Sequence, residues 1–418
     1  TKDADVAIIE IGGTVGDIES LPFLEAIRQL KLEAGPNNAL SVHVTLVPHI
    51  ASAGELKTKP TQHSVREMRE IGIQPDILIC RCDRPIARGL KEKIALFSNV
   101  PVESVVSAVD VSCIYELPLV LHAEGLDAQI AERLNIWSRQ PDLSAWKRTV
   151  EKMLDPSKGS VSIALIGKYV HLRDAYKSLH ESIVHGGLAN DLAVKVHYVD
   201  SEELQRESDM QKMLGQYDAI LVPGGFGDRG LEGKIKAIRY AREHGVPFFG
   251  ICLGMQMAVV EFARHICQLE GANTVEADPG ARHPLIHLMP GQRGIQDKGA
   301  TMRLGAYPCQ LSEGSLAARV YNSSTISERH RQRFEVNNEY RSDLERAGMR
   351  LSGLSPDQLL VEMVELPNHP YFIGCQFHPE FKSKPHQPHP LFTHFIRAAH
   401  DYAHVRPRQE EPSRAELN

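Results

Sequence analysis

The sequence predicts an α/β fold in two domains, because short apolar runs that suit buried strands recur between stretches with helical periodicity. The runs VHVTLVP, DILICRC and VVSAVDV precede residue 137, and VSIALIG, AILVPGG and VPFFGIC follow residue 159. Between these two sets the strand pattern stops, and Pro141, Pro156 and Gly159 interrupt regular structure. Such alternation of strands with helices predicts mostly parallel sheets in both domains.

The domain boundaries follow from the same pattern. VAIIEIGG reads as a buried first strand, and HPLFTHFIRAAHDYA reads as a closing amphipathic helix. The connector between the domains should hold one helix that is capped near Asp142 or Ser144. We therefore predict a first domain over 1–138, a linker over 139–159, a second domain over 160–405 and a flexible tail over 406–418.

Composition restricts the class of protein. The 418 residues include 42% hydrophobic residues, and 47 Lys and Arg stand against 53 Asp and Glu, giving a net charge of −6. This balance, without a long basic run, predicts no nucleic-acid partner. No apolar run reaches the ~18 residues of a membrane span, and no export signal is visible, so we expect no membrane partner. Seven scattered cysteines fit a reducing cytoplasm.

The most specific local signal is VPFFGICLGMQ, in which Cys252 lies between Gly250 and Gly254. An apolar strand enters and a helix leaves, so the cysteine should occupy a sharp strand-to-helix turn. The following helix favours the thiolate form, and the amide of Leu253 should point at an oxyanion. The alternative is a cysteine buried in the core, which is the usual place for this residue.

A cysteine nucleophile needs a base and a group that orients the base. YFIGCQFHPEF supplies both, because His378 and Glu380 stand two residues apart at a strand end and should point the same way. In AILVPGGFGDRG a strand ends at Gly224 and Gly225, whose open backbone suits a second oxyanion donor at Gly225.

The first domain carries acidic and basic segments at predicted element ends. Glu10 precedes a glycine-rich turn, and Asp17 and Glu19 follow it, which suits magnesium and nucleotide hydroxyls. Ordinary capping by Asp17 is the alternative. Lys57 and Lys59, with threonines between and after them, open a helix and suit a triphosphate, although a solvated basic loop has the same composition.

Two family resemblances follow from these motifs. PGG, GxCxGxQ and HPE, in that order over roughly 160–405, resemble the class I glutamine amidotransferases. From Val6 to about Ala403 the chain closely resembles the CTP synthases, through GGTVGDIES, KTKPTQHSV, SAVDVSCIYELPLVL, GKYV, DAYKS and MRLG. The resemblance implies a P-loop-type parallel-sheet synthetase (amidoligase) domain followed by a class I glutamine amidotransferase domain.

The resemblance also implies an activity and its ligands. ATP would phosphorylate O4 of UTP, and ammonia released from glutamine by Cys252, His378 and Glu380 would reach the activated C4 and yield CTP. Mg²⁺ would accompany ATP, CTP would inhibit by feedback, and GTP would activate at a site near Arg229. Members of the family assemble as homotetramers, and the activity is cytoplasmic.

Further residue roles rest on the resemblance alone. Glu276 and Arg333 would grip the charged groups of glutamine, although on sequence alone they would more often be surface charges. The implied glutamine site comprises Gly225, Leu253, Gly254, Met255, Gln256, Glu276 and Arg333. The implied UTP and CTP site comprises Asp17, Ile18, Glu19, Lys57, Thr58, Lys59, Pro60, Thr61, Gln62 and Lys93. Val109, Asp110 and Val111 would border ATP, and Glu10 would bind the metal.

Two alternatives stay open at this level. One is an amidotransferase that aminates another nucleotide or a carboxylate, and the other is a catalytically silent nucleotide-sensing scaffold. In the family, a phosphate loop and a second magnesium aspartate precede the segment that matches Thr1. We therefore expect the 418-residue chain alone not to make CTP, and we expect apolar surface of its first domain to be uncovered.

Overall fold

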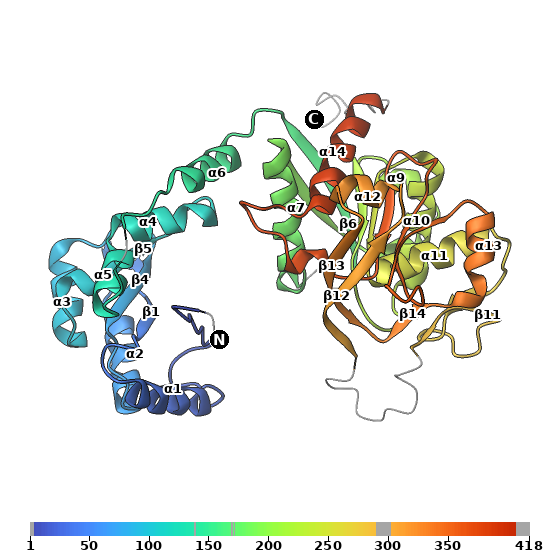
Figure 1. The fold of residues 1–418 in the computed structure, drawn as a ribbon. Helices are drawn as coiled ribbons and strands as arrows, with labels where there is room; N and C mark the ends of the chain where they lie inside the picture. The colour runs from blue at the N-terminus through green and yellow to red at the C-terminus, as the bar shows by residue number, and fades with distance from the viewer. Residues whose placement is uncertain (1–3, 138, 169, 171, 290–301, 407–418) are drawn as a thin grey trace, which may run out of the picture. The chain divides into compact units, whose positions relative to one another are not determined.

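The computed structural model describes residues 4–137, 139–168, 170, 172–289 and 302–406. The chain divides into two compact units, Thr1–Leu154 and Asp155–Asn418. Figure 1 shows the ribbon of each unit with its labelled helices and strands. Each unit has its own sheet and its own buried side chains, so each is described by itself.

A three-stranded parallel sheet forms the centre of the first unit. Its order is β1–β4–β5, with bounds Val42–Leu46, Ile77–Cys82 and Val105–Val109. β4 lies in the middle, and Ile77, Leu78 and Cys80 on it are fully buried. The unit also contains helices α1 to α5, and β2 and β3 form a short antiparallel pair. Their bounds are α1 Leu21–Ala34, α2 Lys59–Glu70, α3 Arg88–Ser98, α4 Leu117–Ala123, α5 Leu126–Arg133, β2 His49–Ile50 and β3 Glu55–Leu56.

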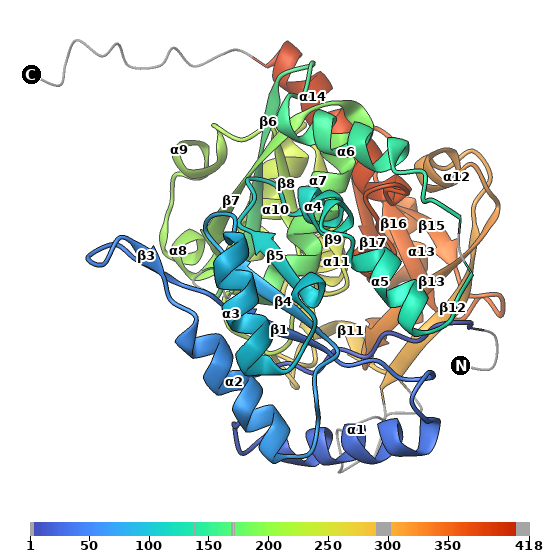
Figure 2. The ribbon, with the colours of Figure 1, turned by 90° about the vertical axis from the view of Figure 1, so that its left-hand side faces the viewer.

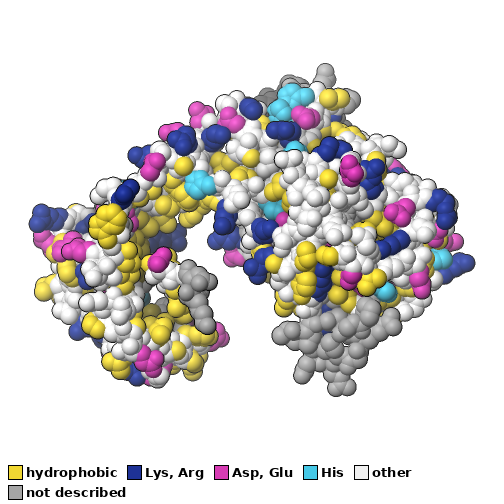
Figure 3. Space-filling model, in the orientation of Figure 1, with side chains coloured by type: hydrophobic (Ala, Val, Ile, Leu, Met, Phe, Trp, Pro, Cys, Tyr) yellow, Lys and Arg dark blue, Asp and Glu magenta, His cyan; other side chains and the backbone are white. Residues whose placement is uncertain are grey.

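The prediction of a buried first strand at VAIIEIGG was wrong. Residues 6–13 form no strand in this structure, and Ile8 and Ile9 are 93% and 66% exposed. No strand of the described chain pairs with this segment, and an unpaired strand leaves its backbone donors and acceptors without protein partners. Apolar side chains of the edge strand β1, among them Val44 and Leu46, are also exposed. Figure 3 shows hydrophobic side chains gathered on this unit.

Most of the segment predicted as a linker, 139–159, forms a helix of the first unit. This helix is α6, Ser144–Leu154. Its cap lies where the sequence indicates, because the Ser144 amide donates to Asp142 at 2.9 Å. Trp146 and Val150 on α6 pack with Tyr115, and the Trp146 indole donates to the Tyr115 carbonyl.

The second unit contains a nine-stranded mixed sheet. Strands β7, β6, β8, β9 and β17 run parallel, and β16, β15, β12 and β13 continue the sheet in antiparallel pairs. The bounds are β6 Ser160–Gly167, β7 Ala193–Asp200, β8 Ala219–Val222, β9 Phe248–Ile251, β12 Arg303–Leu311, β13 Thr325–Gln332, β15 Arg350–Leu354, β16 Val361–Glu365 and β17 Phe372–Cys375. A smaller sheet joins β10 Ala272–Thr274, β11 His283–Leu288 and β14 Phe334–Val336.

Helices cover both faces of the large sheet (Figures 1 and 2). A hydrophobic core lies on each face of this sheet. Successive side chains of a strand point to opposite faces, so neighbouring residues of one strand belong to different cores. Ile163 and Leu165 of β6 pack with α7, α12 and α14, whereas Ala164 and Ile166 pack with α8, α10 and α11. The helix bounds are α7 Lys177–Asn190, α8 Ser201–Arg206, α9 Met210–Leu214, α10 Leu231–His244, α11 Leu253–His265, α12 Leu316–Tyr321, α13 Arg341–Arg346 and α14 Pro390–Val405.

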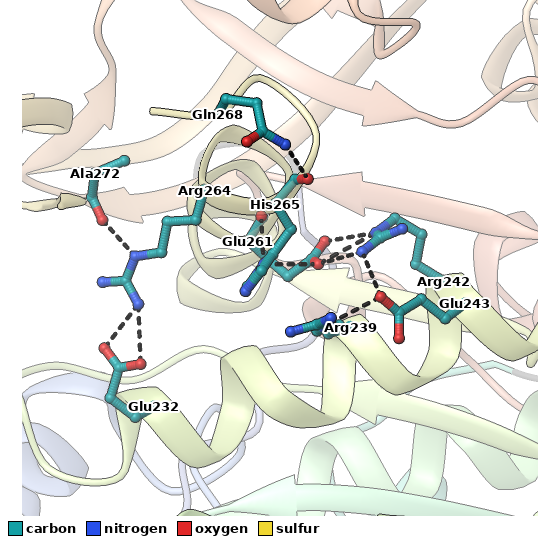
Figure 4. A network of polar contacts seen from close by, with 9 residues as sticks. All are labelled: Glu232, Arg239, Arg242, Glu243, Glu261, Arg264, His265, Gln268 and Ala272. Atoms are coloured by element: carbon teal, nitrogen blue, oxygen red, sulfur yellow. Dashed lines mark hydrogen bonds and ion pairs between the residues drawn. The ribbon is translucent and has the colours of Figure 1, made fainter. Parts of the chain in front are cut away.

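A network of charged side chains ties α11 to α10 (Figure 4). The carboxylate of Glu261 on α11 is fully buried, and Arg242 on α10 donates to it from two nitrogens at 2.8 and 2.9 Å. At the rim, Arg264 donates to both oxygens of Glu232. Since removing one member of a buried ion pair leaves an uncompensated charge, this network holds the two helices in one arrangement.

Close backbone packing sets where α11 begins. A methyl group placed on Gly254 would lie 2.0 Å from the carbonyl oxygen of Val222, the last residue of β8. A methyl group on Gly250 would lie 2.8 Å from the backbone of Gly254. These glycines therefore let the first turn of α11 lie directly against β8 and β9.

We expect Gly254→Ala to lower the free energy of unfolding of the second unit by about 3 kcal/mol, because the added methyl group would have to push apart two backbone segments. The matched control is Gly280→Ala, whose methyl group would meet only Asp278 at an ordinary 3.6 Å. This control should change stability by less than ~0.5 kcal/mol. Urea unfolding measures both, and equal stabilities would contradict the close approach.

Candidate active site

Cys252 stands at the turn between β9 and α11 in a conformation that is rare for a residue with a side chain. Its φ is +52° and its ψ is −105°. The surrounding backbone holds this conformation, because the Cys252 amide donates to the Cys375 carbonyl at 2.7 Å and the Gln256 amide donates to the Cys252 carbonyl at 3.1 Å. Strained residues of this kind concentrate at functional sites.

His378 and Glu380 follow β17, the strand beside β9. Nδ1 of His378 lies 2.7 Å from Oε1 of Glu380, and the His378 amide donates to the Arg329 carbonyl at 2.7 Å. A methyl group placed on Gly224 would lie 2.9 Å from Cε1 of His378 and 3.5 Å from Cβ of Cys252. The carboxyl ends of β8, β9 and β17 thus bring the glycine turn, the sulfur and the imidazole together.

The pKa of His378 is raised even though its imidazole is buried. Burial by itself lowers the pKa of His378, but interactions with Cys252 and, after them, with Glu380 outweigh burial and raise the pKa to about 10. Nε2 of His378 is buried and makes no conventional hydrogen bond with another described residue. Because Glu380 occupies Nδ1, Nε2 is the nitrogen left for proton exchange at the site.

Two backbone amides near the sulfur are unused. Neither the Gly225 amide nor the Leu253 amide donates a hydrogen bond to any described residue. A methyl group on Gly225 would lie 3.3 Å from the Leu253 side chain, so these two residues are neighbours. Unpaired amides next to a nucleophile are the donors that an oxyanion requires.

Lys168 holds the glycine turn, and sequence reasoning missed this role. Its ammonium, at the end of β6, donates to the carbonyls of Phe226 and Gly227, both at 2.8 Å. Glu276 binds the same turn from the other side, since its carboxylate accepts the Gly227 amide at 2.8 Å. The only sequence signal was a lysine directly after a buried strand, in GKYV.

The residues that the family resemblance implies for glutamine binding differ in how far they are buried. Gly254 and Gln256 lie in the first turn of α11, where Gln256 is 4% exposed and donates to the Phe334 carbonyl at 3.1 Å. Arg333 directly precedes β14 and is half-buried. Met255 is fully buried, and its side chain packs against Gly374.

Lys234 on α10 is a second missed residue. Its side chain is 1% exposed, and its ammonium makes no hydrogen bond or ion pair within the described chain. Burial, together with repulsion from Lys168, lowers the pKa of Lys234 to about 7, although attraction to Cys252 opposes this shift. A methyl group on Gly225 would lie 3.8 Å from its Nζ, which places the Lys234 ammonium beside the glycine turn.

The basic segment of the first unit divides into buried and open positions. Thr58, Thr61 and Gln62 are buried. Thr61 bonds to the Leu46 carbonyl at 3.0 Å, and Gln62 bonds to Thr58 at 3.0 Å, so these side chains hold the loop. Lys57 is half-buried, whereas Lys59, Pro60 and Lys93 are exposed.

Lys57 pairs with the carboxylate of Glu55, two residues before it. A hydrogen bond from Lys57 is the main cause that lowers the pKa of Glu55, and the charge of Lys93 adds to it.

The remaining predicted positions lie in turns and at strand ends of the first unit. Asp17 accepts the Thr14 amide at 3.2 Å within the glycine-rich turn, and it does not cap α1, whose cap residue is Ser20. Glu10, Ile18 and Glu19 are exposed. Asp110 follows β5, between half-buried Val109 and Val111, and pairs with Arg81 at 3.0 Å.

Comparisons with known proteins show which family the chain belongs to. Residues 1–136 match the model of the CTP synthase N-terminus, and residues 171–398 match that of class I glutamine amidotransferases. A CTP synthase of Geobacter metallireducens is 60% identical over 398 residues, which are 95% of this chain and 74% of that protein. The chain belongs to the CTP synthase family. It is accordingly a glutamine-hydrolysing CTP synthase, a ligase with an N-terminal synthetase domain and a class I amidotransferase domain.

Other relatives support the same family. The CTP synthase of Syntrophus aciditrophicus is 59% identical over 95% of this chain and 74% of its own length. The glutaminase domain of Trypanosoma brucei CTPS, solved with bound acivicin, is 38% identical, has a TM-score of 0.54, and covers 58% of this chain and 94% of its own. The helices of the described residues include none long and apolar enough to cross a membrane.

The buried Lys234 should make the stability of the second unit depend on pH. Its pKa is about 7 in the folded protein against 10.5 ordinarily, so between these values the unfolded chain binds a proton that the folded chain does not. This group therefore costs most stability at and below pH 7, and the cost disappears as pH rises towards 10.5. We expect Lys234→Met to stabilise the second unit by about 3 kcal/mol more at pH 7 than at pH 9.5.

Urea unfolding at the two pH values measures this difference. Lys212→Met, at an exposed position of α9, is the control and should show no such pH dependence. A Lys234→Met effect that is the same at both pH values would show that the ammonium keeps its charge when folded.

Proposed function

We propose that Cys252, His378 and Glu380 are the glutaminase centre that supplies nitrogen for amination of UTP. The observation that carries this proposal is the Cys252 turn at φ +52°, with the His378–Glu380 pair on the neighbouring strand. The Cys252 sulfur attacks the side-chain carbonyl carbon of glutamine. The Gly225 and Leu253 amides stabilise the negative oxygen that forms.

Proton movements then complete the half-reaction. Protonated His378 gives its Nε2 proton to the leaving nitrogen, and the C–N bond breaks to release ammonia and leave a thioester on Cys252. A water molecule loses a proton to the neutral imidazole and attacks the thioester, which releases glutamate and the sulfur. Glu380 keeps the imidazole oriented throughout, through its bond to Nδ1.

Glutamine recognition falls to residues around the same turn. Glu276 offers a carboxylate for the amino group of glutamine, and the half-buried Arg333 offers a guanidinium for its carboxylate. Gly225, Leu253, Gly254, Gln256 and the Met255 backbone enclose the side chain of the substrate.

The synthetase reaction uses UTP and ATP. ATP transfers its terminal phosphoryl group to O4 of UTP, and ammonia attacks C4 and displaces phosphate to give CTP. Lys57, Lys59 and Lys93 bind the phosphates of UTP, and Thr58, Thr61 and Gln62 hold the loop that carries them, with Pro60 at the start of its helix. Asp17, Ile18 and Glu19 border the same nucleotide, and Val109, Asp110 and Val111 border ATP.

The residues present fit a nucleotide-bound magnesium ion. Among the described residues, no three His, Cys, Asp or Glu side chains gather as a metal cage. Mg²⁺ needs only one or two carboxylates when substrate phosphates and water complete its shell. The exposed carboxylate of Glu10 suits such a ligand. The metal would neutralise phosphate charge during phosphoryl transfer.

Regulation and assembly follow the family. CTP binds the UTP site as a feedback inhibitor, and GTP activates glutamine hydrolysis near Arg229. Arg229 is connected to the glycine turn, because it donates to the Lys168 carbonyl at 3.2 Å and pairs with Glu202 at 3.1 Å. The enzyme works as a homotetramer in the cytoplasm.

Cys252→Ala in the full-length gene product should abolish CTP formation from glutamine, a loss of at least ~10³-fold, and leave CTP formation from ammonium salts unchanged. CTP release with each nitrogen source, followed by ultraviolet absorbance, measures both. Cys267→Ala, at a partly exposed cysteine, is the control and should keep both activities. Equal loss of both activities in Cys252→Ala would assign the cysteine a structural role.

Lys57→Ala and Lys59→Ala should each weaken UTP binding about 10-fold or more, because a charged contact with phosphate is worth roughly 1–3 kcal/mol. Calorimetric titration of the full-length protein with UTP measures the affinity. Lys147→Ala, at an exposed lysine of α6, should bind UTP normally. Unchanged affinity in both test variants would return this segment to a solvated basic loop.

A further inference from the structure

A fully buried amide makes direct contact with the sulfur of Cys252. Gln376 follows β17 and precedes His378 by two residues, and its side chain has no solvent exposure. Nε2 of Gln376 lies 3.5 Å from Sγ of Cys252. The Gln376 backbone is held as well, since its amide donates to the Glu362 carbonyl at 2.8 Å.

A chain of hydrogen bonds determines which end of this amide faces the sulfur. Gln256 has one NH₂ group, and it donates both to the Phe334 carbonyl at 3.1 Å and to Oε1 of Gln376 at 3.0 Å. A backbone carbonyl accepts and never donates, so Phe334 fixes the orientation of Gln256. Oε1 of Gln376 then accepts from Gln256, and the Gln376 NH₂ group is turned to the sulfur.

The sulfur has another polar neighbour, the Arg331 carbonyl, which is a hydrogen-bond acceptor, whereas the Gln376 amide is a donor. The Arg331 carbonyl lies 4.0 Å from Sγ, where it accepts from a thiol but does not stabilise a thiolate. An N–H donor acts the other way, because it stabilises the anion. The charge state of the sulfur therefore depends on Gln376 as well as on His378.

We propose that Gln376 is a catalytic hydrogen-bond donor to the Cys252 thiolate, and that Gln256 is the positioning residue that keeps the Gln376 N–H group turned to the sulfur. Gln376 exchanges no proton and forms no bond. It stabilises the sulfur anion before attack and again when the thioester breaks, and it limits the directions in which the sulfur points. This inference rests on the proposed nucleophile role of Cys252.

The test is the pH dependence of Cys252 alkylation by iodoacetamide in the full-length protein, with the modified peptide quantified by mass spectrometry. Gln376→Met keeps the volume and removes the donor, and the alkylation midpoint should rise by about one pH unit. The glutaminase kcat should fall about 10-fold, while ammonia-dependent CTP formation stays unchanged. Gln376→Glu places a carboxylate at the sulfur and should move the midpoint further in the same direction.

Two further variants separate this role from packing. Gln256→Met should move the midpoint in the same direction by less, because Gln376 remains present but loses its fixed orientation. Gln332→Met removes another buried glutamine, on β13, and should leave the midpoint unchanged even where it lowers the thermal midpoint. If Gln376→Met does not fold, the alkylation midpoint of Gln256→Met, compared with that of Gln332→Met, tests the inference.

An unshifted midpoint in folded Gln376→Met, or an equal shift in Gln332→Met, overturns the inference. Alkylation reports the surroundings of the sulfur whether or not Cys252 attacks glutamine. A failure of this inference is therefore distinguishable from a failure of the proposed function, which the ammonia-dependent activity of Cys252→Ala tests separately.

Discussion

The backbone conformation of Cys252 is the constraint on which the rest of the second unit depends. A side chain at φ +52° costs on the order of 1–3 kcal/mol, and the surrounding structure has to over-determine it. Two things hold this conformation. The backbone of Cys252 is hydrogen-bonded on both sides, and the close backbone contacts at Gly250 and Gly254 leave no room for a side chain. The buried Glu261–Arg242 pair then holds α11, the helix that leaves the turn, against α10.

One strand supplies most of the chemistry around the sulfur. Gln376 and His378 stand two residues apart after β17, and both face Cys252, which is the geometry expected of an extended segment. Lys168 and Glu276 hold the facing glycine turn from separate elements. These groups are thus carried by strand ends and by backbone held in hydrogen bonds, which are rigid parts of an α/β fold.

The sequence predicts the parts of this site that depend on local pattern. Three features follow from glycines and apolar runs: the Cys252 turn, the strand that ends shortly before His378, and the glycine turn directly after Val222. Gln376 and Lys168 were missed because their partners lie 124 and 59 residues away in the chain, and nothing local marks such contacts. The strand expected at VAIIEIGG failed for the same physical reason, since pairing is a property of neighbours and not of the segment itself.

Burial affects how readily several cysteine thiols of this chain lose their protons and react. All seven cysteines are free thiols, and burial raises the pKa of Cys80, Cys309 and Cys375. Even the partly exposed Cys267 has a pKa raised by burial to about 11. At neutral pH these four thiols stay protonated, which lowers their reactivity with small oxidants and electrophiles. The nucleophile role proposed for Cys252 would make this sulfur the position at which oxidative damage concentrates.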